Sequence, residues 1–125
     1  MVAAMPWFAA HAVLYVRFRR GGQSSYPVWE NVYLVEAPTS EGALAAAESR
    51  AREDEGDSNG SFTWEGRPAE WVFAGVRKLV TVALASPEAR PGHGDELTYS
   101  EFSVPSLEEV HQLAAGGTVE VKYTE

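Results

Sequence analysis

The stretch WFAAHAVLYVRFRR, residues 7–20, decides the fold because apolar and amphipathic side chains alternate along it. A period of two residues is typical of a β-strand, in which successive side chains point to opposite faces of the sheet. The stretch VWENVYLVEA, residues 28–37, alternates in the same way. Between them the sequence GGQSSYP, residues 21–27, has the glycines and the proline of a turn. Together these segments predict a long antiparallel hairpin.

Two helices are predicted farther along the chain. The first follows Pro38, with Thr39 or Ser40 as its N-terminal cap. Its apolar positions recur at helical spacing and are mostly alanine, so that it can lie close against a sheet: Ala43, Leu44, Ala47 and Ala51. The second begins with the capping box Ser106-Leu107-Glu108-Glu109 and ends at Gly116. Its predicted buried stripe consists of Leu107, Val110, Leu113 and Ala114.

The remaining apolar segments predict four more strands, at residues 61–65, 71–84, 96–104 and 118–123. Lys78 interrupts the apolar side of the longest one and indicates a bulge or an edge position there. The predicted order is ββαβββαβ. Because the helices follow hairpins rather than every strand, we expect an α+β fold with an antiparallel sheet of five to six strands and both helices on one face. The length of 125 residues fits a single domain, residues 1–125.

Composition excludes several classes of function. The chain has no cysteine, which rules out disulfides, thiol catalysis and thiolate metal sites. A formal net charge of −8 argues against nucleic-acid binding, which needs clustered lysine and arginine. The opening residues Met1–Pro6 have no basic start, and the apolar positions after them are broken by charged residues, so we expect no signal peptide and no membrane span. Cytoplasmic residence is the default expectation.

Several runs of residues resemble a group of small bacterial domains of unknown function. These runs are WFAAH at 7–11, PVWEN at 27–31, the alanine-rich helix after TSE at 39–41, WVFAGVRKL at 71–79 and GTVEV at 117–121. The resemblance covers most of the chain and implies no activity, ligand or catalytic residue. The loop at residues 86–94 does not fit the pattern of that family.

No catalytic or metal-binding set is predicted. The run EGDSNG, residues 55–60, approaches a calcium loop, but it starts with Glu and its twelfth position is Gly66, so a solvated turn is expected. His11 and Glu30 are the only pair that could perform acid–base chemistry, and the alternation of the two strands predicts that they lie on opposite faces. The sequence has no nucleophile elbow, phosphate-binding glycine loop or dinucleotide fingerprint. We therefore predict no catalytic residue and no cofactor.

The distribution of aromatic residues over the predicted sheet is unusual. The side assigned to the helices is aliphatic, with Val28, Val32 and Leu34 from the second strand and Val72, Val76 and Val80 from the strand at 71–84. The opposite side carries large rings and a few polar groups: Trp7, His11, Tyr15, Arg17, Trp29, Asn31, Tyr33, Trp71, Phe73 and Arg77. A ring left in water loses the stabilisation of roughly 1.5–3 kcal/mol that its burial would provide. Exposed patches of this kind mark interaction sites, and Trp, Tyr and Arg dominate binding hot spots.

These observations predict a non-catalytic binding domain whose aromatic face meets a protein partner, most simply a second copy in a homodimer. Three alternatives remain open. Loops of the same chain can cover the rings, and one bulge would move every later side chain to the other face. A curved sheet can form a pocket for a small molecule, or a weak enzyme site, with Arg77, His11 or Glu30 directed into it. The acidic charge also permits a role as an antidote to a basic toxin.

Overall fold

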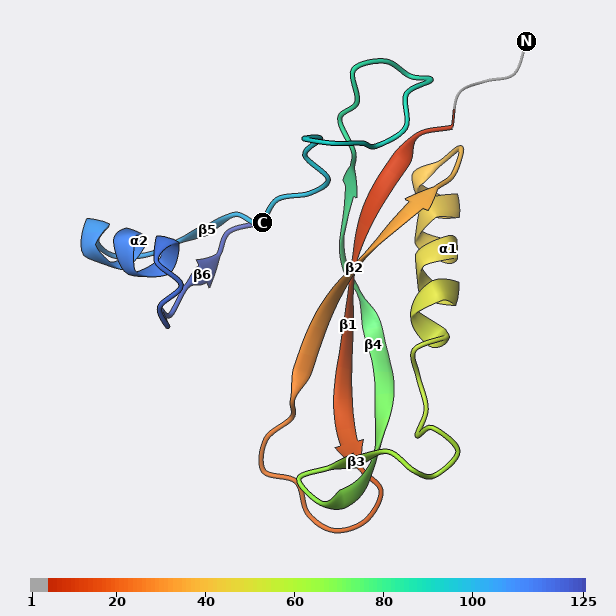
Figure 1. The fold of residues 1–125 in the computed structure, drawn as a ribbon, viewed down its shortest axis with the longest axis vertical. Coiled ribbons are helices and arrows are strands. Elements are labelled where there is room, and N and C mark those ends of the chain that lie inside the picture. The colour runs from red at the N-terminus through yellow and green to blue at the C-terminus, as the bar shows by residue number, and fades with distance from the viewer. Residues whose placement is uncertain (1–4) are drawn as a thin grey trace.

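The computed structural model describes residues 5–125 and contains the predicted order of elements, ββαβββαβ (Figure 1). The prediction that the chain starts without a signal peptide concerns Met1–Pro6, and residues 1–4 of that stretch lie outside the described residues. No helix in the described part is long and apolar enough to cross a membrane. The elements are β1 (Trp7–Phe18), β2 (Val28–Glu36), α1 (Ser40–Arg52), β3 (Thr63–Trp64), β4 (Arg67–Thr81), β5 (Phe102–Ser103), α2 (Leu107–Ala114) and β6 (Lys122–Tyr123).

The strands form two sheets rather than the single sheet of five to six strands expected from the sequence. Four antiparallel strands pair in the order β2-β1-β4-β3, and β5 pairs separately with β6. The predicted strands at 96–104 and 118–123 shrink to two residues each. The segment between β4 and β5 carries this two-stranded sheet away from the main sheet, so it cannot extend the main sheet (Figure 1).

Helix α1 packs as its alanine spacing predicts. The side chain of Thr39 accepts a hydrogen bond from the N–H of Gly42 at 3.0 Å and caps the helix. Ala43, Ala47 and Ala51 are fully buried. Small side chains let the helix approach the sheet closely, and it contacts β1, β2 and β4. We call the side of the sheet beneath this helix the α1 face and the other side the opposite face.

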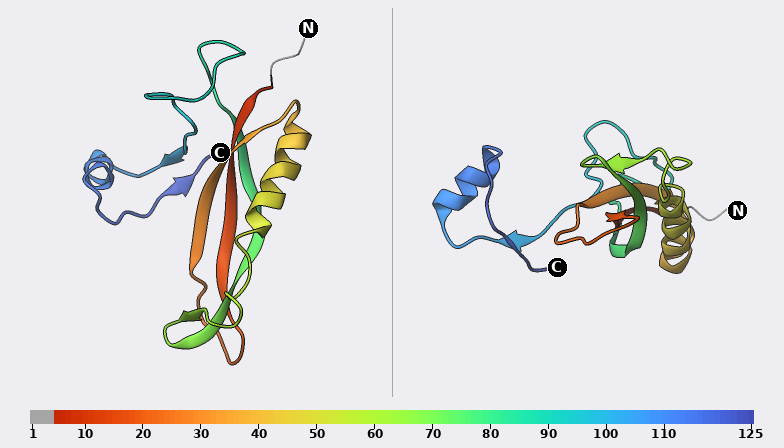
Figure 2. Two further views of the ribbon diagram at one scale, coloured as in Figure 1. Left: turned by 45° about the vertical axis from the view of Figure 1, so that its right-hand side comes forward. Right: turned by 90° about the horizontal axis from the view of Figure 1, so that it is seen from below.

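Helix α2 does not lie on the sheet, which corrects the prediction that both helices cover one face (Figures 1 and 2). Its N-terminal cap forms as expected, with Ser106 Oγ accepting from the N–H of Glu109 at 3.2 Å. In a standard capping box the backbone N–H of the cap residue donates to the Glu carboxylate. Here the Ser106 hydroxyl donates to the Glu109 carboxylate instead, at 3.0 Å. The predicted buried stripe is wrong: Leu107 is 71% and Val110 45% exposed, and no residue of this helix is buried.

The register of the strands decides which side chains share a face. Even-numbered residues of β1 pair with odd-numbered residues of β2, as Leu14 does with Trp29. The pairing of β1 with β4 shifts twice, between His11 and Ala12 and between Val13 and Leu14, so that Leu14 meets Phe73. The first shift leaves an extra residue beside Lys78, where the sequence indicates a bulge. Because directly paired residues point to the same side, this register sets the composition of both faces.

Candidate functional site

The ten residues predicted to form one aromatic face are divided between the two sides of the sheet. Trp29, Asn31, Tyr33, Trp71 and Phe73 are in register with the even-numbered residues of β1, whose buried members Ala12 and Leu14 pack with Ala51 of α1. Trp7, His11, Tyr15 and Arg17 belong to the odd-numbered set on the opposite face. Arg77 joins this second group through its contact with Glu30. Odd-numbered positions of all three strands were predicted to share one face, and the observed register shows that this prediction is wrong.

Rings on the α1 face are covered largely by the chain itself. Tyr33, Trp71 and Phe73 pack against the core formed by Ala12, Leu14 and Ala51. Trp71 also stacks on Phe62 with 5.7 Å between centroids and meets Trp29 edge-on at 4.9 Å, and Trp29 meets Trp64 edge-on at 5.6 Å. Phe62 and Trp64, which sequence reasoning left out, come from the segment between α1 and β4. Trp29 remains 43% exposed.

Tyr33 and Asn31 are held in a polar network at the end of α1. The Tyr33 hydroxyl donates to the Asp54 carboxylate and accepts from Asn31 Nδ2 at 3.3 Å. Arg50 pairs with Asp54 at 3.1 Å and lies over the Tyr33 ring at 4.8 Å. Burial is the main cause that raises the pKa of Tyr33, and the hydrogen bond to Asp54 adds to it. The pKa of Asp54 is lowered, mainly by the hydrogen bond from Tyr33 and to a smaller extent by Arg50. The Tyr33 hydroxyl is therefore engaged on both sides by contacts within the chain.

The opposite face carries a buried histidine. His11 is 2% exposed, with Nε2 2.5 Å from Thr98 Oγ1 and Nδ1 3.5 Å from Glu30 Oε2. The prediction that His11 and Glu30 lie on opposite faces is therefore wrong, because Glu30 pairs with Val13 and shares the odd-numbered side of β1. A hydroxyl, an imidazole and a carboxylate in series resemble a catalytic triad. At 2% exposure, however, the imidazole offers no access to a substrate.

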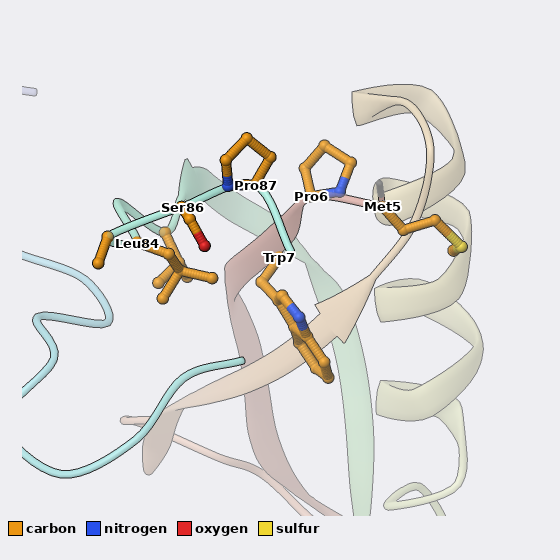
Figure 3. Close-up of a pocket in the computed structure, with 8 residues that line it drawn as sticks. Met5, Pro6, Trp7, Leu84, Ser86 and Pro87 are labelled. Carbon is orange, nitrogen blue, oxygen red and sulfur yellow. The ribbon is translucent and has the colours of Figure 1, made fainter. Parts of the chain in front are cut away.

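The other members of this group contact neighbouring side chains of the chain. Tyr15 meets Tyr26 edge-on with 5.7 Å between ring centroids, and Arg17 pairs with Glu70 at 2.7 Å. Trp7 lines an apolar cleft of about 300 Å³ at the start of β1, which Figure 3 shows together with Pro6 and Pro87. None of the described residues that line this cleft is charged.

The C-terminal arm, residues 98–125, attaches to the opposite face through polar contacts. Figure 2 shows the arm and α1 on opposite sides of the sheet. Arg77 bonds to Glu30, pairs with Glu125 at 3.0 Å and lies over the Tyr123 ring at 4.6 Å. Lys78 pairs with Glu125 at 3.1 Å and donates to the carbonyl of Tyr99. Arg77 lowers the pKa of Glu30 more than His11 does. The arm is thus held by charge more than by apolar packing.

Attachment of the arm should depend on pH. The N–H of Glu101, with Lys78 and Arg77, lowers the pKa of Glu125 from 4.5 to about 2. A lowered pKa means that the contact is complete above pH 4.5 and is lost as the pH falls through about 2. We expect the amide chemical shifts of Glu101 and Thr124 to change over this range, and Glu125→Gln to produce the same change at neutral pH. Glu120→Gln, an exposed position on the same arm, is the control, and equal responses would contradict the assignment.

Strand β2 presents an apolar edge that sequence analysis placed under the helices. Val28 is 58%, Val32 46% and Leu34 41% exposed, which corrects that prediction. Among the described residues β2 pairs only with β1. The N–H of Val16 donates to the Pro27 carbonyl and that of Ala37 to the Pro6 carbonyl, so odd-numbered positions of this strand face β1. Alternate residues of an antiparallel strand face opposite ways, and the backbone groups of Val28, Val32 and Leu34 therefore point outward.

Comparison with known proteins identifies the family and adds no activity. A family model described as a domain of unknown function (DUF4288) matches residues 7–97. The match includes the loop at residues 86–94, which the sequence analysis places outside the family pattern, and it ends just before the C-terminal arm. No curated protein and no solved structure matches the chain. Since the matched region runs from the start of β1 to beyond β4 and covers most of the chain, this protein belongs to the DUF4288 family.

Proposed function

We propose that this chain is a non-catalytic interaction domain that self-associates by pairing the β2 edges of two copies. The observation that carries the proposal is an edge strand of nine residues on which Val28, Trp29, Val32 and Leu34 are all at least 41% exposed. Long apolar edges with free backbone groups readily add another strand. Trp29 is the one residue that this surface shares with the ten-residue aromatic face predicted from the sequence.

A second copy suits this edge because two identical strands can pair antiparallel about a twofold axis, each contributing the same residues. Pairing centred on Val32 places Glu30 opposite Leu34 of the second copy. That register sets no like charges directly opposite one another, an arrangement that would be destabilising. The carboxylate of Glu30 is also neutralised within its own chain by Arg77. The two four-stranded sheets would then form one continuous sheet.

Sedimentation velocity at micromolar concentration tests the proposal. We expect the wild-type chain to form a dimer and Val32→Lys to weaken the dimer at least about thirtyfold, the effect of losing one hot-spot residue. Val32→Pro removes a backbone N–H that points away from β1, so it should also weaken the dimer without unfolding the chain.

Val110→Lys is the matched control because Val110, on α2, is 45% exposed and Val32 is 46% exposed. We expect this variant to dimerise like the wild type. A wild-type chain that stays monomeric, or a dimer that Val110→Lys disrupts as strongly as Val32→Lys does, would exclude pairing through β2.

A further inference from the structure

We propose, independently of self-association, that the end of the β1–β2 hairpin binds a small oxyanion carrying two or more negative charges. A cleft of about 550 Å³ lies there and is lined by Arg19, Arg20, Gly60, Arg67 and Pro68. Its volume is in the range of sites for small molecules. Three arginines around one cleft form an unusual grouping in a chain of net charge −8 with only ten basic residues.

The charges at this end of the molecule do not cancel. Arg19 pairs with Asp57, and the nearby Arg17 pairs with Glu70. Among the residues that the structure describes, the guanidinium group of Arg20 has no hydrogen-bond or ion-pair partner, and that of Arg67 has no acidic one. Two of the three arginines that line the cleft are therefore without an acidic partner. Because the surrounding protein is acidic, this is a local electrostatic site rather than part of a basic surface.

Arg67 is held in place with part of its guanidinium group free. Its Nη2 donates to the carbonyls of Arg20 at 2.6 Å and Gly22 at 3.2 Å, and the group lies over the Phe18 ring at 3.6 Å. In the described chain, Nε and Nη1 have no partner, so three of the five N–H donors of an arginine are available. A fixed guanidinium suits phosphate or carboxylate oxygens, which it can bind in a bidentate manner.

A glycine in the hairpin loop permits this arrangement. Gly21 has a φ of 85°, and a Cβ added there would lie 2.7 Å from Arg67 Nη2. A larger residue would therefore displace the guanidinium. The loop thus holds Arg67, which lines the cleft, against the carbonyls of Arg20 and Gly22. Phosphate groups and clustered carboxylates both present several negatively charged oxygens, which a guanidinium group binds. The experiment below uses one ligand of each kind to distinguish them.

Isothermal titration with inorganic pyrophosphate, and separately with citrate, tests the site at constant ionic strength. We expect binding of at least one of these ligands, with amide shift changes at Gly60 and Gly22. Arg20→Ala should weaken binding about tenfold through loss of a charge-assisted bond. Because the Arg20 side chain has no partner in the described structure, and its backbone carbonyl is unchanged by the substitution, this variant should keep its fold. Asp57→Asn should strengthen binding, since it frees Arg19 from its acidic partner.

Arg90→Ala is the control, because Arg90 is exposed in the loop after β4 and its loss changes the net charge by the same amount. Binding of pyrophosphate alone supports a phosphate site, and binding of citrate alone supports a carboxylate site. Binding of both supports a site that accepts either kind of oxyanion. Absence of binding up to about 10 mM would overturn the proposal. Equal weakening by Arg20→Ala and Arg90→Ala would also overturn it, because it would indicate general charge attraction.

Discussion

We expect Leu14→Ala to lower the free energy of unfolding by about 2–5 kcal/mol, the usual cost of removing a buried leucine side chain. Leu14 is 1% exposed in β1 and packs with Ala12 and Ala51, while Trp71 and Phe73 lie against the same cluster. The side chains of Ala12 and Ala51 are too short to fill the cavity that the substitution leaves, so the site can collapse only partly. Urea denaturation followed by tryptophan fluorescence measures the loss.

Leu34→Ala makes the same chemical change on the neighbouring strand and is the matched control. Leu34 is 41% exposed, and its truncation should cost less than about 1 kcal/mol. Measurement at low protein concentration separates this value from any effect on self-association. If the two variants lose equal stability, the assignment of β1 as the centre of the core is wrong.

Local patterns predicted the elements of this fold well. Alternation located β1 and β2, and the caps at Thr39 and Ser106 form as their side-chain chemistry requires. Gly116 follows α2 with a φ of 85°, the left-handed conformation that glycine adopts most easily. Such features depend on residues near one another in the chain, so a sequence contains the information needed to recognise them.

The faces of the sheet could not be predicted in the same way. Alternation divides the residues of each strand into two sets but does not say which sets of two strands align. The alignment depends on the geometry of the loop after β1 and on the two register shifts between β1 and β4. A one-residue difference exchanges the faces. For this reason Trp71 and Phe73 lie on the α1 face, and His11 lies on the same side as Glu30.

Tertiary contacts also decided the position of α2 and the site at the hairpin end. The amphipathic stripe of α2 predicts burial, but its position depends on the segment after β4 and on the charged contacts of Glu125 with Arg77 and Lys78. Arg67 is far from Arg19 and Arg20 in the sequence and joins them only because β4 pairs alongside β1. A count of basic residues argued against a nucleic-acid surface but could not detect three arginines brought together by folding.

A second large effect is expected at the contact between α1 and the sheet. Ala47→Glu should lower the free energy of unfolding by more than about 3 kcal/mol, because it places an unpaired charge and a longer side chain where Ala47 is fully buried. A loss of this size is a large part of the stability of a small domain, so circular dichroism should show an unfolded or partly folded chain at room temperature.

Ala46→Glu separates this effect from any change in helix propensity. Ala46 is the preceding residue of the same helix and is exposed, and glutamate forms helices nearly as well as alanine. This control should retain a cooperative thermal transition close to that of the wild type. Similar melting temperatures for the two variants would mean that the alanine side of α1 does not pack against the sheet. The rings of Tyr33, Trp71 and Phe73, which pack with the core that Ala51 helps to form, would then need cover from elsewhere.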